Sequence, residues 1–312
     1  MAKELIPARK TGLAKTLTKA LSMWQLYVLI LPAIAYLFIF HIMPMYGVQI
    51  AFKDFRTSKG IWDSPWVGLK HFKRFVTYPN FWKLVRNTIA LSLYSLATFP
   101  LPVMLALLIN EVRNNRFKKT VQMITYAPHF ISVVVLCSMV TLFLSPSSGA
   151  INKFIEFFGG KPVSFMASAP MFKWIYVISG IWQGVGWSSI IFTAALAGVD
   201  RSLLEAADID GATRIQKIWY VNVPVLIPTI VIMLILQCGS LLSVGYEKVY
   251  LLQNDFNMTA AEVISTYTYK VGLEQADFAF STAVGVLNSV VNSIILIIVN
   301  AISRRVSETA LW

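Results

Sequence analysis

Charged side chains are scarce in this 312-residue sequence, because Asp, Glu, Lys and Arg together make up only 13% of it. A soluble domain usually carries about 25% of these residues, and the hydrophobic share here is 56%. The scarcity excludes an ordinary soluble globular protein and favours a protein embedded in a membrane. Because no soluble basic domain is present, the net charge of +12 does not indicate nucleic-acid binding.

Cysteine and histidine are also rare, with two and three copies. Cys137 and Cys238 both lie within apolar runs, so they indicate neither a disulfide framework nor a metal site. A membrane-embedded enzyme would need a nucleophile–base pair or a metal cluster at membrane depth. Scattered histidines without an intramembrane carboxylate argue against that class, and we expect no catalytic residue and no metal ligand.

Long apolar runs are what the sequence has instead. A helix needs roughly 20 apolar residues to cross the hydrocarbon core of a bilayer. Six runs reach that length, and none contains Asp, Glu, Lys or Arg. We predict an all-α integral membrane protein with six transmembrane helices, several of them bent at prolines. The six runs are Trp24–Tyr46, Ile89–Ile109, Val121–Leu144, Trp174–Val199, Val221–Val244 and Ala283–Ile302.

The distribution of Lys and Arg predicts the orientation. These residues are denser in segments 1–23, 110–120, 200–220 and 303–312 than in the loops between them. Positively charged loops face the cytoplasm, so both termini are expected inside a bacterial inner membrane. No small-residue cleavage site follows the first run, which favours an uncleaved span over a signal peptide. The first outer loop mixes aromatic and basic residues, and we expect it to lie along the lipid interface.

The lack of charge inside the runs bears on the substrate. Carriers driven by protons or sodium often keep an acidic residue in the membrane, so its absence argues against them and against a strongly charged substrate. A neutral polyol needs amides, hydroxyls and aromatic faces. Gly184 and Gly186 give room beside such groups, although the amides could instead join helices to one another. The candidate substrate-path residues are Tyr94, Trp182, Gln183, Trp187, Gln237, Asn288 and Asn292.

A short helix is predicted in the segment between the fourth and fifth runs. Ser202 and Glu205 have the Ser-x-x-Glu spacing of a capping box, and Gly211 can end the helix in a left-handed conformation. The helix would run from about Leu203 to Asp210, roughly 12 Å at 1.5 Å per residue. A helix this short is not stable alone in water. It is either an ordinary loop helix or a docking element for a partner.

The same segment carries a family resemblance. Glu205-Ala206-Ala207, three residues, Gly211, nine residues and then Val221-Asn222-Val223-Pro224 resembles the EAA loop of bacterial ABC importer permeases. That family has Ile-x-Leu-Pro at the end of the pattern, so the two valines keep its apolar character. The family often has a proline near position 200, where this chain has Asp200. Ile209-Asp210-Gly211-Ala212 is typical of the sugar-importing branch.

Other segments are similar to the same family. They are Asn87-Thr88 before the second run, Pro128 with Ile131-Ser132, and Gly149 with Ile151-Asn152. The resemblance covers about residues 80–302, the expected transmembrane core with its EAA loop at 200–224. Residues 1–23 are then a cytoplasmic segment, 24–79 the first span with its outer loop, and 303–312 a cytoplasmic tail. That first span and loop, with Tyr46-Gly47 and Phe52-Lys53-Asp54, resemble the branch that imports oligosaccharides or polysaccharide fragments.

The resemblance implies a mechanism and a set of partners. Two permease subunits, here expected to differ, would form the path, and two ATPase subunits would bind ATP and Mg and grip the EAA helices. A solute-binding protein would deliver the sugar from outside. This chain lacks a Gly-x-x-x-x-Gly-Lys-Ser/Thr loop, so it cannot supply the ATP chemistry itself. The resemblance implies a transport subunit that is not an enzyme and holds no cofactor of its own. The residues implied at the ATPase contact are Ser202, Leu203, Leu204, Glu205, Ala206, Ala207, Asp208, Asp210 and Gly211.

Two further interpretations stay open at this point. One is an ABC permease for a peptide or another polar solute. The other is a membrane scaffold or channel, for which the EAA pattern would be a coincidence.

Overall fold

The computed structural model describes residues 22–307 and 310–311 of the chain. Within this part nearly all residues are helical, and the only β-type pairings are two isolated bridges, Lys53 with Trp66 and Arg56 with Gly60. The all-α prediction is confirmed. The predicted N-terminal segment 1–23 lies outside the described residues except at its last two positions, and so does part of the predicted tail 303–312.

Five helices of the described chain are long and apolar enough to cross a membrane, and a pair of helices bent at 100° makes a sixth if the pair counts as one span. Five of the six predicted runs correspond to the five helices, and the run Val121–Leu144 falls in the bent pair. The unbent five are Trp24–Phe52 (α2 Trp24–Leu37, η1 Phe38–Ile42, α3 Met43–Met45, η2 Tyr46–Phe52), Phe81–Asn110 (α5 Phe81–Ala97, α6 Pro100–Asn110), Ala169–Leu196 (α10), Arg214–Gly239 (α12 Arg214–Lys217, η5 Ile218–Asn222, α13 Val223–Gly239) and Phe278–Arg305 (within α17, Phe278–Ser307).

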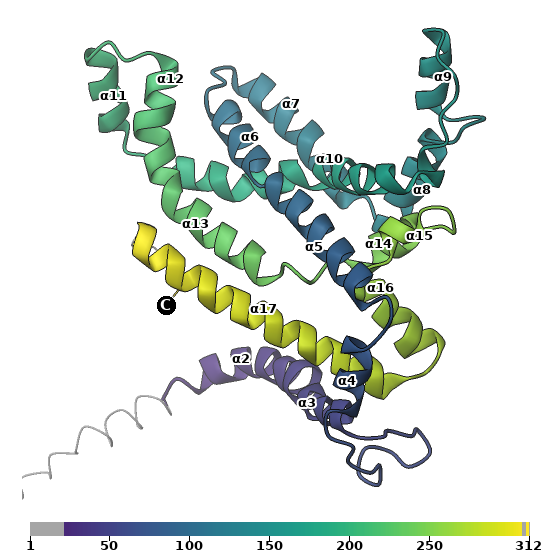
Figure 1. The fold of residues 1–312 in the computed structure, drawn as a ribbon. Helices are drawn as coiled ribbons and strands as arrows, with labels where there is room; N and C mark the ends of the chain where they lie inside the picture. Colours follow the sequence, from purple (N-terminus) through teal and green to yellow (C-terminus); the bar gives the residue numbers. More distant parts are fainter. Residues whose placement is uncertain (1–21, 308–309, 312) are drawn as a thin grey trace, which may run out of the picture.

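Short elements connect the spans (Figure 1). They are α4 (Lys70–Val76), α9 (Ala150–Phe157), η4 (Phe165–Ala167), α11 (Arg201–Ile209), α14 (Tyr246–Leu252), α15 (Met258–Ala261), α16 (Ile264–Tyr269) and η6 (Lys270–Glu274).

Prolines bend the spans where the sequence places them. Pro44 and Pro224 are each the second residue after a π-helical turn, η1 and η5. A proline has no N–H for the carbonyl four residues earlier, and its ring clashes with that carbonyl. The wider π turn relieves this clash. Pro100 is the first residue of α6, directly after the break that ends α5.

The predicted third run, Val121–Leu144, contains Pro128 and was expected to bend, and in the structure it is divided into two helices. Asn115–Phe130 (α7 Asn115–Tyr126 and η3 Ala127–Phe130) and α8 (Val133–Phe143) meet at 100°. Ile131 and Ser132 between them have extended backbone, and the Ser132 hydroxyl accepts from the N–H of Val135 at 3.4 Å. The carbonyl freed at Ile131 accepts from Gln183 Nε2 of α10 at 3.0 Å. A tertiary hydrogen bond thus replaces the one that the bend removes.

The fifth span also ends earlier than the predicted Val244. α13 ends at Gly239, and two asparagines of α17 hold the irregular segment that follows. Asn292 Oδ1 accepts from the N–H of Leu242 at 3.0 Å, and Asn288 Nδ2 donates to the carbonyl of Leu242 at 3.2 Å. Because side-chain amides satisfy this backbone, it does not need to be helical at this depth.

Several residues that carry the family resemblance form hydrogen bonds or close contacts that hold the loops in place. Asn87 Nδ2 donates to the carbonyls of Thr259 and Glu262, each at 3.0 Å. Asn152, which is 1% exposed, donates to the carbonyls at 144, 145 and 163. A Cβ on Gly149 would lie 2.4 Å from the Phe143 carbonyl oxygen, so glycine is required there. These residues fix the loops outside the spans.

The helix α10 is the centre of the bundle, in contact with α6, α7 and α13. α13 packs in turn on α17, and α17 carries η2 and α4 on its other side. The first span lies at the edge, along α17, and none of the residues of α2 is buried (Figure 1). Its apolar surface therefore faces lipid or a partner subunit.

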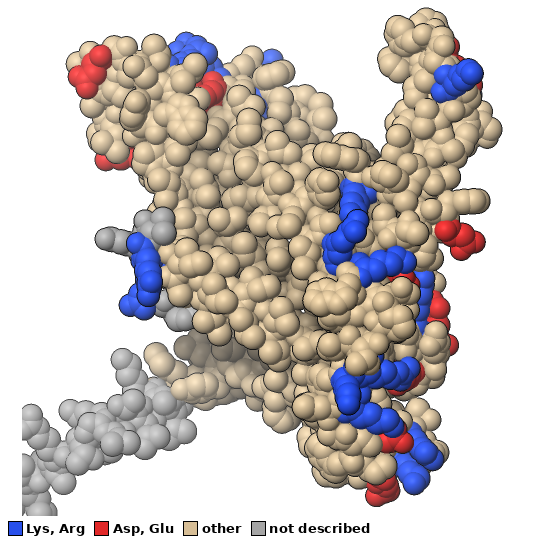
Figure 2. All heavy atoms as spheres, in the orientation of Figure 1, with Lys and Arg blue, Asp and Glu red and all other residues tan. Residues whose placement is uncertain are grey.

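The two ends of the bundle differ. The start of α2, the end of α17 and α11 lie at one end, and α4, α9, α14, α15 and α16 lie at the other (Figure 1). Lys, Arg, Asp and Glu gather at these two ends, with a belt of uncharged atoms between them (Figure 2). That distribution fits a bilayer across the middle. At the second end, Arg74 binds Asp277 at 2.6 Å and joins α4 to the segment before α17.

Candidate functional site

The helix α11 starts earlier than predicted, at Arg201, because a different residue caps it. The Asp200 carboxylate accepts from the N–H of Ser202 at 2.9 Å, and this hydrogen bond holds the pKa of Asp200 below its ordinary value. The predicted capping box of Ser202 and Glu205 is therefore wrong. The sequence contains two residues that favour a helix N-cap, Asp200 and Ser202. Asp200, at a position where the family often has proline, is the N-cap in the structure.

The end of α11 is built as predicted, around Gly211. This glycine has φ +74°. The N–H of Ala212 donates to the Ala207 carbonyl at 2.9 Å, and the N–H of Gly211 donates to the Asp208 carbonyl at 3.2 Å. These two bonds are the Schellman arrangement, which requires a left-handed residue at the turn. Both ends of α11 are thus closed by residues within or next to it.

A second set of local bonds ties α11 to the fifth span. Lys217 Nζ binds Asp208 Oδ1 at 2.6 Å. Thr213 and Gln216 form a capping box that starts α12, and α12 continues through η5 into α13. An ion pair and a continuous helix thus connect α11 to α13.

The outer face of α11 combines apolar and acidic side chains. Leu203 is 52% and Ile209 87% exposed, and Glu205 and Asp210 are exposed beside them. Among the residues predicted at the ATPase contact, Leu204 and Ala207 are partly covered, and the others are exposed. Ile215, Trp219 and Tyr220 extend the exposed apolar surface onto α12 and η5. The prediction had not included these three, although their position directly after the glycine stop was a usable signal.

Most of the predicted substrate-path residues are engaged in packing. Gln183 holds the bend at Ile131, and Trp187 stacks on His129 with ring centroids 4.4 Å apart. Asn288 and Asn292 hold the segment after α13, as described above. Tyr94 lies against Trp174 at 5.3 Å, and Trp182 borders two mainly apolar depressions. Gln237 alone among the seven lines the cavity described next.

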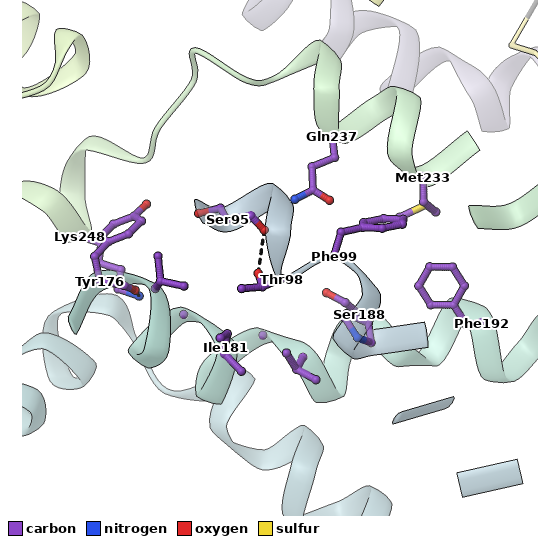
Figure 3. Close-up of a pocket in the computed structure, with 15 residues that line it drawn as sticks. Ser95, Thr98, Phe99, Tyr176, Ile181, Ser188, Phe192, Met233, Gln237 and Lys248 are labelled. Carbon is purple, nitrogen blue, oxygen red and sulfur yellow. Dashed lines mark hydrogen bonds between the residues drawn. The ribbon is translucent and has the colours of Figure 1, made fainter. Parts of the chain in front are cut away.

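A cavity of about 270 Å³ lies between the α5–α6 break, α10, α13 and the start of α14. Tyr176, Gly180 and Lys248 border it at one end, and Phe99, Phe192 and Met233 border it at the other (Figure 3). Ser95, Thr98, Ser188 and Gln237 lie between these two groups. The cavity thus offers hydroxyls and an amide along its length, with aromatic rings at the end nearer α11. Hydrogen-bonding groups together with aromatic faces are what a sugar requires.

Lys248 brings a cation to this cavity. It is half-buried, and its Nζ donates to the Tyr176 carbonyl at 2.9 Å and lies 4.8 Å from the centroid of the Tyr176 ring. Burial lowers the pKa of Lys248 to about 8. The runs themselves carry no charged residue, but a lysine from the loop that follows α13 reaches this cavity. No local signal marked Lys248, because the fold of α14 alone carries it to the cavity.

Two glycines of α10 that the sequence singled out have different roles. A Cβ on Gly184 would meet nothing within 4 Å, so Gly184 leaves the cavity open. A Cβ on Gly186 would lie 2.0 Å from the Thr125 carbonyl oxygen, so Gly186 allows α7 and α10 to approach closely.

We expect Gly186→Val to destabilise the protein, because Thr125 presents backbone that cannot swing aside. Overpacking of this kind typically costs about 1–3 kcal/mol. Thermal unfolding in detergent, followed by the monodisperse fraction on size-exclusion chromatography, measures the effect. Gly184→Ala is the matched control and should unfold at the wild-type temperature. Equal stability of Gly186→Val and wild type would contradict the close contact of α7 and α10.

The chain matches known proteins over most of its length. Residues 99–308 match the family model described as "Binding-protein-dependent transport system inner membrane component". The polygalacturonan/rhamnogalacturonan transport system permease protein YteP of Bacillus subtilis (strain 168) is 42% identical over 305 residues, which are 97% of this chain and 95% of YteP. Protein LplB of the same strain is 40% identical over 318 residues, 99% of this chain and 100% of LplB.

A solved structure has the same fold. A chain of a bacterial ABC transporter "involved in the import of the acidic polysaccharide alginate" superposes with a TM-score of 0.86 at 38% identity. The match covers 94% of this chain and 99% of that chain. The fold described above therefore matches that of an experimental structure over nearly its full length.

Proposed function

This chain belongs to the family of binding-protein-dependent transport system inner membrane components, the membrane-spanning subunits of ABC importers, and from this we propose that it carries an oligosaccharide or a polysaccharide fragment. It is a transport subunit of the membrane and not an enzyme. The observation that carries the proposal is α11, an exposed helix closed at both ends and fastened to the fifth span. Such an element suits the transfer of force from a partner to the path.

The substrate class follows from the relatives and the cavity together. The names of two similar proteins refer to polygalacturonan or rhamnogalacturonan and to alginate, which are all polysaccharides. The cavity between α10 and α13 is lined by hydroxyls, the Gln237 amide and the ring of Phe99. Those groups serve the hydroxyls and the apolar faces of a sugar, and the proposal of a carbohydrate over a peptide depends on this match.

The partners complete the mechanism that we propose. An extracytoplasmic solute-binding protein delivers the sugar, a second and different permease subunit forms the other half of the path, and two ATPase subunits bind ATP and Mg. Glu205, Ala206, Ala207 and Gly211 lie at the ATPase contact, with Leu203 and Ile209 as its apolar part. Closure of the ATPases moves α11, and the ion pair of Asp208 with Lys217 passes this movement to α13.

The orientation forms part of the proposal. The end of the bundle that carries α11 faces the cytoplasm, so the described start of the first span and the end of the last span face it too. The density of Lys and Arg in the loops supports this placement. The cavity then has Lys248 at its outer end and Phe192 at its inner end.

Purification from native membranes in mild detergent tests the assembly. We expect an ATPase subunit and a second six-span permease to accompany the wild-type chain. Glu205→Lys reverses a charge on the exposed face of α11, and we expect it to lower the ATPase yield at least tenfold. Glu156→Lys makes the same change on exposed α9 at the opposite end and should leave the yield unchanged.

The outcomes separate the alternatives. Loss of the ATPase from Glu205→Lys alone supports the contact at α11. A wild-type chain that purifies alone, without an ATPase, would leave the scaffold or channel interpretation in first place.

A further inference from the structure

The outer end of the cavity holds a cation, Lys248, whose protein contacts are the neutral carbonyl and the ring of Tyr176. Lys248 reaches the cavity from α14, while the rest of the lining comes from the spans. In Figure 3 its side chain and that of Tyr176 lie together at one end, and the amide of Gln237 points into the same space. The lysine therefore borders the route that the proposed substrate takes.

The ammonium has no anionic partner in the described part of the chain. The structure contains no carboxylate within 4.0 Å of Lys248 Nζ there, whereas five other pairs of basic and acidic side chains meet that distance. Tyr176 supplies a neutral carbonyl and a ring. The charge is therefore partly desolvated and uncompensated, which is costly unless a ligand supplies the opposite charge.

The surroundings leave space for such a ligand. A Cβ on Gly180 would lie 3.2 Å from Lys248 Nζ, so the glycine makes room for the ammonium. An ammonium has three donors, and one of them is used by the Tyr176 carbonyl. The side chain of Gln237 forms no hydrogen bond with the described residues and is available to hydroxyls of the same ligand.

We propose that Lys248 binds a carboxylate of the transported sugar, so that the substrate class is an acidic, uronate-containing oligosaccharide. The inference rests on the proposed function of the chain as an oligosaccharide permease subunit. Because Lys248 lies at the outer end of the cavity, it is the first group of the cavity that the sugar contacts once the binding protein releases it. A neutral sugar would leave the buried ammonium without a partner, so the site discriminates by charge.

The names of the similar proteins agree with this chemistry. Galacturonate units make polygalacturonan an acid, and alginate is called an acidic polysaccharide. The lowered pKa of Lys248, about 8, still leaves most of the side chain protonated at neutral pH. A bound carboxylate would favour the charged form further.

Transport by the assembled protein tests the site. The tagged chain is purified with its native partners, reconstituted into proteoliposomes and supplied with the binding protein outside. Uptake of trigalacturonate and of an alginate trisaccharide is compared with uptake of neutral arabinotriose. We expect the wild type to accept an acidic probe. Lys248→Met should lower its uptake at least tenfold, while ATP hydrolysis stimulated by the loaded binding protein stays within twofold.

Two further variants complete the design. Lys248→Arg keeps the charge and should retain at least a third of the uptake. Lys270→Met removes a lysine of the same outer segment that points away from the cavity, toward Met258 Sδ at 3.9 Å, and should transport as the wild type does.

The results that overturn the inference differ from those that overturn the proposed function. Transport of an acidic probe by Lys248→Met within twofold of wild type rejects a carboxylate site at Lys248. Wild-type uptake of arabinotriose with no uptake of either acidic probe rejects it too and keeps the sugar permease. Failure of all three probes, with no stimulation of ATP hydrolysis, counts against the proposed function itself.

Discussion

Replacement of Gly211 by proline should reduce uptake at least tenfold while the protein remains inserted in the membrane at its normal level. Gly211 has φ +74°, and a proline ring fixes φ near −65°. The substitution also removes the N–H that donates to the Asp208 carbonyl. The end of α11 must unwind, and Asp208 no longer holds its position opposite Lys217. Insertion is spared because α11 lies outside the six spans.

Gly211→Asn is the matched control. Asparagine tolerates the left-handed conformation better than other residues with a Cβ, so this variant should keep most of the uptake. Sugar uptake and copurification of the ATPase are measured for both variants at equal membrane levels. Normal transport by Gly211→Pro would show that α11 does not couple the path to the ATPase.

Gly184→Trp should block transport without loss of folded protein. A Cβ on Gly184 meets nothing within 4 Å, and the residue faces a cavity of about 270 Å³. An indole there would fill much of the space between α10 and α13 that the proposed substrate occupies. We expect uptake to fall at least tenfold, with an unchanged unfolding temperature and an unchanged ATPase yield.

Gly184→Ala tests whether volume is the cause. A methyl group leaves most of the cavity open, so uptake by this variant should stay close to that of wild type. If Gly184→Trp transports normally at equal membrane levels, the cavity between α10 and α13 is not the route. If both variants lose uptake and both unfold at a lower temperature than wild type, a side chain at position 184 does not fit, and the structure is wrong about the open space there.

The spans could be predicted from sequence because the bilayer imposes a simple rule. A backbone in hydrocarbon must satisfy its own hydrogen bonds, so uncharged runs of sufficient length become helices. The bend of the third span follows no such rule. The hydrogen bond that compensates the bend comes from Gln183, which is distant in sequence from Ile131. Pro128 indicated a kink there but could not give its angle.

In the candidate site, too, local sequence preferences predicted some features, and features that depend on tertiary packing could not be predicted. The glycine stop of α11 was predictable, because a left-handed turn has a strong residue preference. The start was not, because Asp200 and Ser202 are both good caps and only the path of the preceding chain decides between them. Lys248 lies in a loop by every local pattern. Its place beside Tyr176 results from the packing of α14 on α8 and α10, which no short-range signal reports.

The closed ends of α11 have a consequence for how the transporter assembles. The Asp200 cap, the Gly211 turn and the bond from Asp208 to Lys217 are all made within this chain. Fixing the backbone of one residue costs about 1–2 kcal/mol of conformational entropy. For α11 this entropy is lost when the permease folds and not when a partner binds. In the assembly that we propose, the ATPase encounters a preformed helix, so we expect its association to be fast and close to rigid-body docking.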